Sequence, residues 1–384
     1  MTYKLQLALA ALLSGTQLTH AAYSLVKTYK GESFFNDWTY YGSYDNLTNG
    51  DIVWVNRSTA DNEPRLTYIN SAGNAIIKVD NTTVVPYNEK RNSVRLTSND
   101  KIGLGTLLVF DAVHVPYGCS VWGALWTKAV GDLWPAGGEI DIFEAVNLMS
   151  QNQMALHTVT GCTQAEGIAQ TGTTNVRNCD AEGSNGAGCT VMDPSPNSYG
   201  APFAAAGGGV WVTEFADTGV NIWFFSRGDV PSSLSTDSVD ISSLGTPTAA
   251  YPSSSCNPSQ FFKEQEIVID ITLCGDWAGV KSVLESTCPA LNGTNTCYTT
   301  YVLDPKNYDT AYFEMSSVKL FASSPSAVSL APSSTQTSST GSGGSGGSSG
   351  NGANGAFDRI WSAYAGALVA LVASAAVGTA ALGF

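Results

Sequence analysis

The chain has few charged residues. Asp, Glu, Lys and Arg make up only 13% of its 384 residues, about half of the roughly 25% expected of a soluble domain. Basic residues are scarcer still, with 18 Lys and Arg against 32 Asp and Glu, and the formal net charge is -14. Because nucleic-acid binding is driven mainly by Lys and Arg contacts to phosphates, this balance argues against a nucleic-acid partner.

Several patterns of metal and nucleophile chemistry are also missing. The sequence has no C-x-x-C, no H-E-x-x-H and no phosphate-binding loop, G-x-S-x-G occurs only in the low-complexity Gly/Ser stretch 341–350, and there are only 3 His. We therefore expect neither a metal nor another cofactor. Aromatic residues are plentiful, with 9 Trp, 16 Tyr and 14 Phe. Such a chain can bury enough apolar area to offset its ordering entropy, which excludes disorder throughout.

The first 22 residues have the pattern of a secretory signal. Lys4 supplies a positive charge, Leu5–Leu13 an apolar core, and Thr19–Ala22 a cleavage site of small residues. The apolar run is too short to span a bilayer, and this order of segments favours a signal peptide over a buried helix. We therefore expect a secreted protein.

The other end predicts a lipid anchor. Residues 323–356 form a Ser/Gly-rich linker, and residues 357–384 form a short spacer followed by an apolar tail. Small residues, spacer and terminal tail together are the signal for a glycosylphosphatidylinositol anchor, in which the tail is removed. We expect attachment near residues 351–354, at Asn351, and contact with the plasma membrane or cell wall through this anchor alone. A C-terminal membrane helix is the alternative, and the many Ala and Gly of the tail weaken it.

The cysteines agree with export. All 8 lie between Cys119 and Cys297, and an even number in a secreted chain predicts disulfides, although the sequence leaves their pairing open. Four N-x-S/T sequons predict glycosylated surface positions; they begin at Asn46, Asn56, Asn81 and Asn292.

The body of the chain, residues 23–322, reads as one β-rich unit without an internal linker. Runs rich in Val, Ile, Thr and aromatics, bounded by turn residues, predict strands. These runs are Ser93–Leu96, Thr106–Val115, Glu139–Ala145, Met154–Val159, Val210–Phe215, Gly219–Phe225, Glu266–Leu273 and Tyr312–Phe321. Their number and spacing predict an all-β fold, a large antiparallel sandwich or jelly roll. The loop over residues 161–199 is long, and we expect disulfides to staple it.

Three acids lie within six residues of one predicted strand, at Glu139, Asp141 and Glu144. Side chains alternate along a strand, so Glu139 and Asp141 share one face while Glu144 falls on the other. One extra residue, a β-bulge around Ile142–Phe143, brings all three to the same face.

Crowded carboxyls are costly, and glycoside hydrolysis has a use for them. Their mutual repulsion raises some pKa values, so that one carboxyl stays protonated as an acid while another is ionised as a nucleophile. A pair about 5–5.5 Å apart hydrolyses with retention through a covalent glycosyl-enzyme intermediate. The residues alone do not decide which Glu is the nucleophile. Alternatively, the three acids form an ordinary solvated face of the sheet. Calcium binding is disfavoured, because three acids on one strand lack the loop geometry that surrounds the ion with oxygens.

Aromatics near this cluster are suited to sugar, because pyranose rings stack on indoles. Trp122, Trp126, Trp134 and Trp277 lie near predicted turns or strand ends. Trp223, inside an apolar run, is expected in the core. His157, taken alone, is expected to be a structural group.

The body resembles glycoside hydrolase family 16, and specifically the fungal endo-1,3(4)-β-glucanases or laminarinases. The resemblance covers residues 23–322 in order; it is carried by Arg91–Arg95, His114–Cys119, Trp122, Trp126, Trp134–Asn147, Leu156–Thr158, Asn197–Gly200, Trp223–Phe225, Cys274–Gly279 and Tyr312–Glu314.

The resemblance implies a concanavalin-like β-jelly roll whose curved sheet forms an open substrate cleft. It implies that Glu139 is the nucleophile, Glu144 the acid/base and Asp141 the assisting acid. Further residues are expected to bind substrate; they are Trp126, Trp134, His157, Trp277, Trp122, Arg91 and Asn147.

These observations predict a retaining endo-glycosidase that hydrolyses β-1,3- or mixed β-1,3/1,4-glucan at the cell surface. Its partner would be a neutral β-glucan, and we expect a monomer. Two alternatives stay open. A transglycosylase would pass the intermediate to another sugar, and a non-catalytic glucan-binding module would use the acids only to hold hydroxyls.

Overall fold

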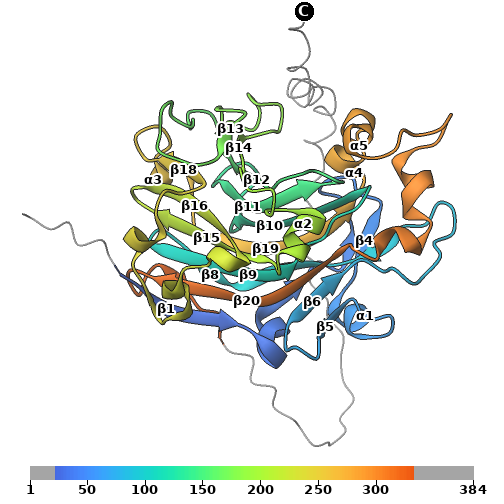
Figure 1. Cartoon of the computed structure of the whole chain (residues 1–384), viewed down its shortest axis with the longest axis horizontal. Helices are drawn as coiled ribbons and strands as arrows, with labels where there is room; N and C mark the ends of the chain where they lie inside the picture. Colours follow the sequence, from blue (N-terminus) through green and yellow to red (C-terminus); the bar gives the residue numbers. More distant parts are fainter. Residues whose placement is uncertain (1–21, 333–384) are drawn as a thin grey trace, which may run out of the picture.

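A computed structural model describes residues 22–332 of the protein. Nearly all of the predicted signal peptide, the linker beyond residue 332, Asn351 and the apolar tail lie outside these residues. Within them, the strands form two nine-stranded sheets and a three-stranded one. The two large sheets lie face to face as the layers of a sandwich (Figure 1).

We name the two large sheets after a central strand of each. The β9 sheet runs in the order β17 (Ser238–Val239), β1 (Tyr23–Tyr29), β20 (Tyr312–Ala322), β9 (Thr106–His114), β15 (Gly209–Ala216), β16 (Gly219–Ser226) and β18 (Ala249–Pro252), with β6 (Ala75–Lys78) and β5 (Thr67–Ile69) beside β20. The β11 sheet runs in the order β13 (Thr173–Thr174), β14 (Cys189–Met192), β12 (Gln153–His157), β11 (Glu139–Val146), β10 (Val121–Ala129), β19 (Gln265–Leu273), β8 (Arg95–Ile102) and β2 (Trp38–Tyr40), with β21 (Val328–Ser329) beside β8.

The remaining elements are short. The third sheet contains β3 (Ser43–Tyr44), β4 (Ile52–Trp54) and β7 (Arg91–Ser93). The α-helices are α1 (Arg57–Asp61), α2 (Gly200–Ala205), α3 (Pro258–Phe261), α4 (Gly275–Ala278) and α5 (Lys281–Thr287). The 3-10 turns are η1 (Gly31–Asp37), η2 (Arg227–Asp229), η3 (Ser232–Ser235), η4 (Ile241–Leu244) and η6 (Pro305–Tyr308), and η5 (Tyr298–Val302) is a π-helical turn.

Seven of the eight predicted strands are present within two residues of their expected ends. The eighth, Ser93–Leu96, covers the end of β7 and the start of β8, which continues to Ile102. The central strand β10 was not anticipated. It contains Gly123, where a Cβ atom would approach the Pro116 ring to 2.2 Å. A glycine inside a strand usually weakens the strand pattern, but here it allows close packing of the neighbouring chain. Pairing with β11 and β19 along its whole length holds β10 in place.

An aromatic core joins the two large sheets. Phe143 of β11 and Trp211 of β15 pack edge to face with ring centroids 5.3 Å apart. Phe110 stacks on Trp211 from β9, and Phe313 meets Phe143 from β20. Full burial of each such ring contributes about 1.5–3 kcal/mol to the free energy of unfolding. Trp223 is buried as expected, in a smaller cluster on the outer face of the β9 sheet.

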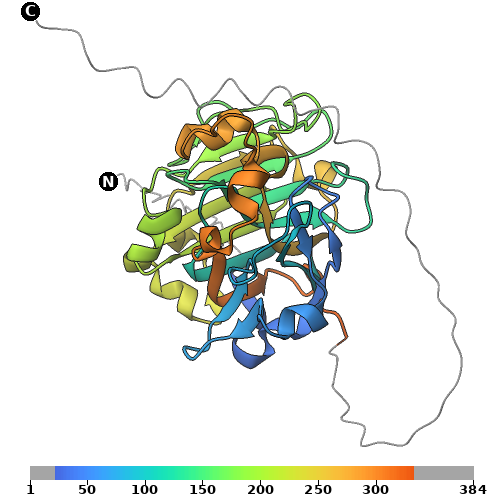
Figure 2. The ribbon, with the colours of Figure 1, turned by 90° about the vertical axis from the view of Figure 1, so that its right-hand side faces the viewer.

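All eight cysteines form disulfides, as predicted. Cys162–Cys256 and Cys179–Cys189 hold the long loop over residues 161–199 against the body. Cys119–Cys288 and Cys274–Cys297 hold the segment that contains α4 and α5. In Figure 2, this segment and the long loop rise from the same side of the molecule.

The folded body extends beyond residue 322, where the linker was expected to begin. Ala327 and Val328 are buried, and β21 adds an edge strand to β8. Apolar residues at these two positions of an otherwise Ser-rich stretch explain why the chain packs there. Among residues 22–332, no helix is both long and apolar enough to cross a bilayer.

Candidate active site

A long cleft crosses the face of the β11 sheet that points away from the β9 sheet. Its volume is 2310 Å³, several times the roughly 300–1,000 Å³ of a small-molecule pocket. Strands β10, β11, β12 and β19 form its floor, and residues 131–138, residues 173–194 and helices α4 and α5 contribute its walls. A space of this size and shape fits an extended polymer better than a small metabolite.

The three acids of β11 share the cleft face because of a β-bulge. Leu125 of β10 pairs with Phe143 and Trp126 pairs with Asp141, so that Ile142 has no partner on β10. The predicted bulge around Ile142–Phe143 is confirmed. Glu139, Asp141 and Glu144 all line the cleft, whereas Ile140, Ile142 and Phe143 are buried.

Asn152 satisfies the backbone at this bulge. Its Oδ1 accepts from the Glu144 amide at 2.9 Å, and its Nδ2 donates to the Ile142 carbonyl at 3.1 Å. Unpaired backbone groups are costly when buried, so this buried amide stabilises the kink that turns Glu144 into the cleft.

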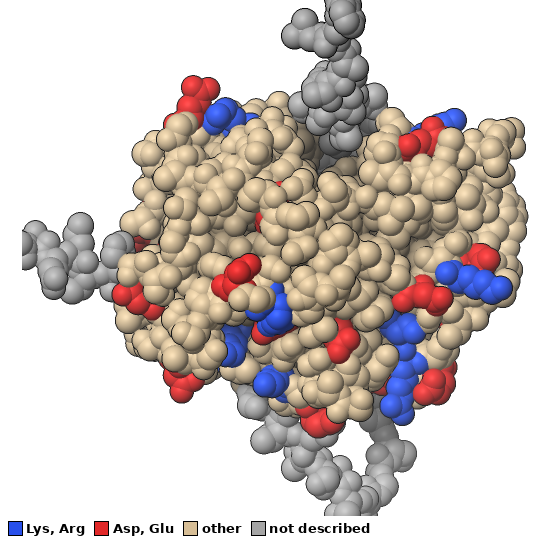
Figure 3. Space-filling model, in the orientation of Figure 1, with Lys and Arg blue, Asp and Glu red and all other residues tan. Residues whose placement is uncertain are grey.

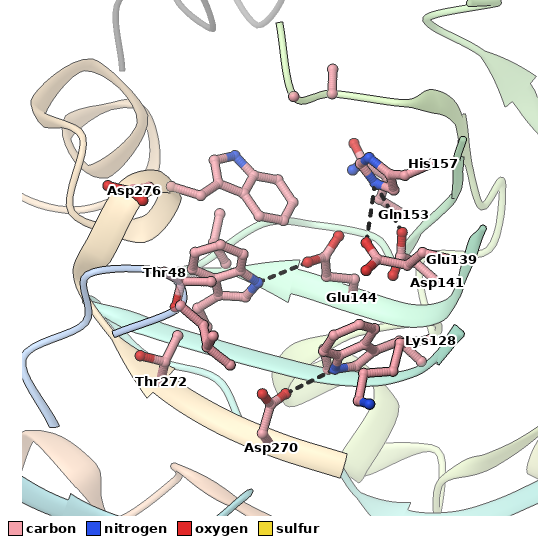
Figure 4. Close-up of a pocket in the computed structure, with 18 of the residues that line it drawn as sticks. Thr48, Lys128, Glu139, Asp141, Glu144, Gln153, His157, Asp270, Thr272 and Asp276 are labelled. Carbon is pink, nitrogen blue, oxygen red and sulfur yellow. Dashed lines mark hydrogen bonds and ion pairs between the residues drawn. The ribbon is translucent and has the colours of Figure 1, made fainter. Parts of the chain in front are cut away.

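Tryptophan indoles orient the acids of the cleft. Each donates its Nε1 proton to a different carboxylate: Trp134 to Glu139 at 2.9 Å, Trp122 to Glu144 at 2.9 Å and Trp126 to Asp270 at 3.2 Å. Two of these bonds are drawn in Figure 4, at Glu144 and Asp270. These hydrogen bonds fix the positions of the carboxyl groups, and the indole rings also offer apolar faces.

His157 lies over two of the acids (Figure 4). Its Nε2 atom is 3.0 Å from Asp141 Oδ2 and 3.7 Å from Glu139 Oε1. Pairing of β12 with β11 places His157 opposite Glu139. The residue alone indicated a structural histidine, and the family resemblance implied a place among the substrate-binding residues; the structure places His157 in the cleft beside the acids.

The loop that ends in the Cys179–Cys189 disulfide lies against the other side of this imidazole. A Cβ atom at Gly188 would lie 2.9 Å from His157 Nδ1 and 2.5 Å from the Leu156 carbonyl oxygen. Gly188 also has a φ of 65°, a conformation that glycine adopts without steric cost. The backbone at Gly188 therefore sets the space available to His157.

The acids differ from free carboxyls in their protonation. Burial, followed by the charge of Asp141, raises the pKa of Glu139 well above its usual value. Burial and Asp270 have the same effect on the pKa of Asp141. Burial and Asp141 raise the pKa of Glu144 to about 8. Crowded carboxyls of one sign cannot all ionise, so the cluster retains protons at neutral pH.

A fourth acid, Asp270 of β19, was missed by the sequence analysis. Its Oδ2 accepts from Arg95 at 2.7 Å, and the Arg95 guanidinium lies 4.9 Å from the centre of the Trp126 ring. Both residues line the cleft. A signal was available, because Asp270 is an acid at an alternating position of the apolar run 267–273.

The cleft tryptophans occupy strands as well as loops. Trp126 lies within β10 rather than near a strand end, and Trp122 lies on the same face at the start of that strand. Trp122 and Trp277 pack edge to face, with ring centroids 5.6 Å apart. Trp134 lies 5.9 Å from the His157 ring. The four tryptophans predicted to bind substrate all line the cleft.

Two residues predicted to bind substrate lie elsewhere. Arg91 is 0% exposed and donates to the carbonyls of Asp80, Thr83 and Val302. Asn147 is also buried and accepts from the Ser120 amide. Both tie loops together beneath the cleft. Arg91 does not line the cleft as predicted. The arginine that does so is Arg95, four residues later.

The four sequons are spread over the surface. Asn56 and Asn292 are exposed and Asn81 is half-buried. Asn46 is exposed too, but it lines the cleft, and its Oδ1 accepts from the Tyr41 hydroxyl at 2.6 Å.

Two groups of potential metal ligands occur among the described residues. Glu139, Asp141 and His157 place ligand atoms within 4.8 Å of one another, and so do Cys162, Cys179 and Cys256. The cysteines are consumed by disulfides. The other group could hold a cation by distance alone, but it coincides with the acids that sugar chemistry requires.

Comparison with known families assigns most of the chain to one domain. Residues 38–321 match the model described as the XgeA-like catalytic domain of glycoside hydrolase family 16. A probable endo-1,3(4)-β-glucanase of Neosartorya fischeri is 38% identical over 337 residues, which are 86% of this chain and 50% of that protein. The chain thus spans about half the length of this curated relative.

Solved structures of similar proteins agree. A structure of laminarinase 16A from Phanerochaete chrysosporium, with β-glucans in both donor and acceptor sites, is 35% identical and has a TM-score of 0.73. The match covers 78% of this chain and 100% of the laminarinase chain. An elongating family 16 β-1,3-glucosyltransferase is 37% identical, with the same coverage and TM-score. These structures support the predicted jelly-roll fold.

Proposed function

We propose a function for this chain from one premise: it belongs to glycoside hydrolase family 16. The chain is an endo-acting glycoside hydrolase that cleaves β-1,3- or mixed β-1,3/1,4-glucan with retention of anomeric configuration. The observation that carries the proposal is the set of three acids, Glu139, Asp141 and Glu144, on one face of β11 within a long cleft.

The reaction has two displacements. In the first, a Glu139 oxygen forms a bond to the anomeric carbon while the glycosidic bond breaks, and Glu144 gives its proton to the leaving oxygen. In the second, Glu144 takes a proton from water as the water oxygen attacks the anomeric carbon, and the bond to Glu139 breaks. Glu144 ends protonated and Glu139 ionised, so that the cycle is closed.

The surroundings of the two Glu residues support these roles. A pKa of about 8 leaves Glu144 protonated at neutral pH, as a general acid requires. Glu139 has the Trp134 indole proton at one oxygen and the His157 imidazole near the other. Both groups stabilise negative charge on Glu139, which favours it as the nucleophile. Asp141, between them, assists by holding a proton.

A neutral polymer suits the remainder of the cleft. Four tryptophans and many hydroxyl and amide side chains line it, and sugars are bound by stacking and hydrogen bonds. Charged side chains on the face shown in Figure 3 are scattered among a larger uncharged surface. A non-catalytic module would gain nothing from buried, mutually repelling acids.

The test is hydrolysis of laminarin by carboxyl variants. We expect Glu139→Gln and Glu144→Gln to lower reducing-sugar release to below about one-thousandth of the parent rate. Glu63→Gln, at an exposed carboxyl beside α1, is the matched control and should match the parent. Unchanged release by Glu139→Gln would refute the proposal.

Azide separates the two roles. In Glu139→Gly, azide can occupy the space of the missing nucleophile, and an activated aryl β-laminaribioside should yield the α-glycosyl azide by a single displacement. In Glu144→Gly, azide attacks the covalent intermediate and should yield the β-glycosyl azide. The opposite pair of products would exchange the roles.

Transglycosylation is a second candidate, favoured by one observation. A structure that is 37% identical to this chain is that of an elongating β-1,3-glucosyltransferase. The same intermediate would then pass to the hydroxyl of another glucan. Two labels distinguish these outcomes. Longer products that carry a labelled laminari-oligosaccharide acceptor require transfer, whereas incorporation of oxygen from isotopically labelled water into the product requires hydrolysis.

The predicted signal sequence and C-terminal tail bear on where the enzyme acts. We propose that it is secreted, acts as a monomer and is held at the plasma membrane or wall by a lipid anchor at Asn351. Four disulfides support an extracellular compartment. Release of the enzyme from intact cells by phosphatidylinositol-specific phospholipase C tests the anchor, and light scattering of the released protein tests the monomer.

A further inference from the structure

A second, smaller hollow lies beyond the rim of the cleft. Its volume is 250 Å³. Its walls come from residues 49–51, from the start of α4 and from the segment before η5; the polar side chains among them are Asn49, Asp51, Asp276, Thr296 and Tyr298. The mechanism proposed above uses none of these residues.

The hollow adjoins the cleft at Asp276. This residue lines both spaces, and the next residue, Trp277, faces the cleft. Asn49 donates to Asp276 Oδ2 at 2.9 Å, and the Asp276 amide donates to the Thr48 carbonyl at 2.9 Å. In Figure 4, Asp276 lies at the far end of the cleft from His157. A chain leaving the cleft past Trp277 therefore meets this hollow next.

An exposed aromatic surface stands beside the hollow. Tyr87 is 68% exposed and Val84 is 72% exposed, values that are high for large apolar side chains. The Tyr87 ring lies 6.0 Å from the ring of Tyr298, inclined by 57°. Tyr298 lines the hollow, and its hydroxyl donates to the Glu89 carbonyl at 2.8 Å.

Tyr298 is held in place at both its backbone and its hydroxyl. Cys297, the residue before it, forms a disulfide with Cys274 at the start of α4. The Glu89 bond ties it to the loop that carries Tyr87. A ring held in this way loses little conformational entropy on binding, which is the property that makes tyrosine useful at recognition surfaces.

We propose that Tyr87 and Tyr298, with the adjoining hollow, form a distal binding site for β-glucan. This inference rests on the proposed function. The site holds a stretch of polymer that has already passed out of the cleft: the tyrosine rings contact the C–H faces of the sugars, and Asn49 and Thr296 bind hydroxyls. Such a contact keeps an insoluble glucan on the enzyme between cleavages.

Its test is glucan binding in a Glu139→Gln background, which leaves the polymer intact. We expect Tyr87→Ala to weaken adsorption to insoluble linear β-1,3-glucan about two- to tenfold. The dissociation constant for laminaritetraose, which fits within the cleft, should change less than about twofold on the same arithmetic. Tyr87→Phe, which retains the ring, should adsorb like the parent. Because Tyr87 is exposed, its replacement leaves the core intact.

Controls separate this proposal from its alternatives. Tyr68→Ala, on strand β5 of the opposite sheet, should leave both affinities unchanged. Asn292→Gln removes the sequon six residues before Tyr298, so that a glycan at this position cannot cover the tyrosines. Equal adsorption by Tyr87→Ala and its parent, with or without Asn292→Gln, would refute the distal site while leaving the cleft assignment intact. A parent that bound neither the polymer nor the tetraose would refute the proposed function and the distal site together.

Discussion

The Nε2 atom of His157 lies 3.0 Å from the Oδ2 atom of Asp141. One imidazole from β12 thus faces the central acid of β11, and it also lies 3.7 Å from Glu139. Asp141 Oδ2 is a buried oxygen without a hydrogen bond of good geometry among the described residues. His157 is a basic side chain in contact with both of these acids.

Replacing His157 tests this contact. We expect His157→Asn to lower kcat on laminarin about 10²-fold, with a smaller change in KM, because the imidazole stabilises the ionised form of Glu139. The pH profile of kcat should change as well, which a purely structural role would not produce. His114→Asn is the matched control. His114 stacks on Tyr312 in the β9 sheet, far from the acids, and any stable variant should retain the parental kcat and pH profile.

The pKa of Glu144 predicts an alkaline limit of activity. The general acid must carry its proton, and its pKa is raised to about 8. The value of kcat/KM should therefore fall about tenfold for each pH unit above that value. Initial rates on laminarin from pH 5 to pH 10 measure this limb. A rate that rose continuously through pH 9 would contradict the assignment of Glu144 as the acid.

Stability should depend on pH in the direction that raised carboxyl pKa values dictate. Between the usual pKa of Glu, 4.5, and about 8, the folded chain binds more protons at Glu144 than the unfolded chain does. The free energy of unfolding therefore decreases as pH rises through this window.

Glu144→Gln removes this effect. We expect it to raise Tm by about 2–4 °C relative to the parent at pH 8. At pH 4, where the parental carboxyl is protonated in both states, the two Tm values should agree. Calorimetry at both pH values checks the sign, and a variant that was less stable at pH 8 than at pH 4 relative to the parent would contradict it.

The Asp270–Arg95 pair should position Trp126. Asp270 accepts from both residues, so Asp270→Ala leaves a buried guanidinium without its anion and an indole without its acceptor. We expect a loss of about 3 kcal/mol in the free energy of unfolding and a higher KM for laminarin. The exposed pair of Arg57 and Asp61 offers the control. Asp61→Ala should cost less than about 1 kcal/mol and leave KM unchanged.

Substitutions at two glycines of one loop test whether the contact with Gly188 positions the His157 imidazole. Gly186 and Gly188 both have positive φ, but a Cβ atom at Gly186 would meet nothing within 4 Å. Gly188→Ala should lower kcat about tenfold, because the added methyl displaces the imidazole by a few tenths of an ångström. Gly186→Ala also places a side chain at positive φ, but without that contact. A similar loss of kcat in both variants would show that loop strain, and not the His157 contact, is responsible.

Much of the site could be predicted because it lies on one strand. The spacing of Glu139, Asp141 and Glu144 specifies which face each side chain takes, once a bulge is allowed. The apolar residues between them specify which face is buried. The tryptophans near Glu139 and the even number of cysteines could be identified for the same reason: each is a property of a short segment or of composition.

Other features could not be read in this way. Asp270 and Trp126 lie 144 residues apart and meet only because β10 pairs with β19. Arg91 and Arg95 are both basic residues near a strand start, yet one is buried in a loop junction and the other faces the cleft. Nothing in their immediate sequence distinguishes the two. Strand β10 contains Gly123 and Lys128, which are unfavourable in strands, and it could be recognised as a central strand only from its pairing with β11 and β19.

The sequence by itself determined the β-rich class, the presence of disulfides but not their pairing, and the spacing that, with one bulge, points three acids one way. These follow from local backbone geometry and from the apolar residues that each strand must bury. Tertiary structure alone decided which strands are neighbours, which indole faces which carboxylate and where His157 lies. Those contacts join distant segments of the chain, and the burial they create is what raises the pKa values of the acids.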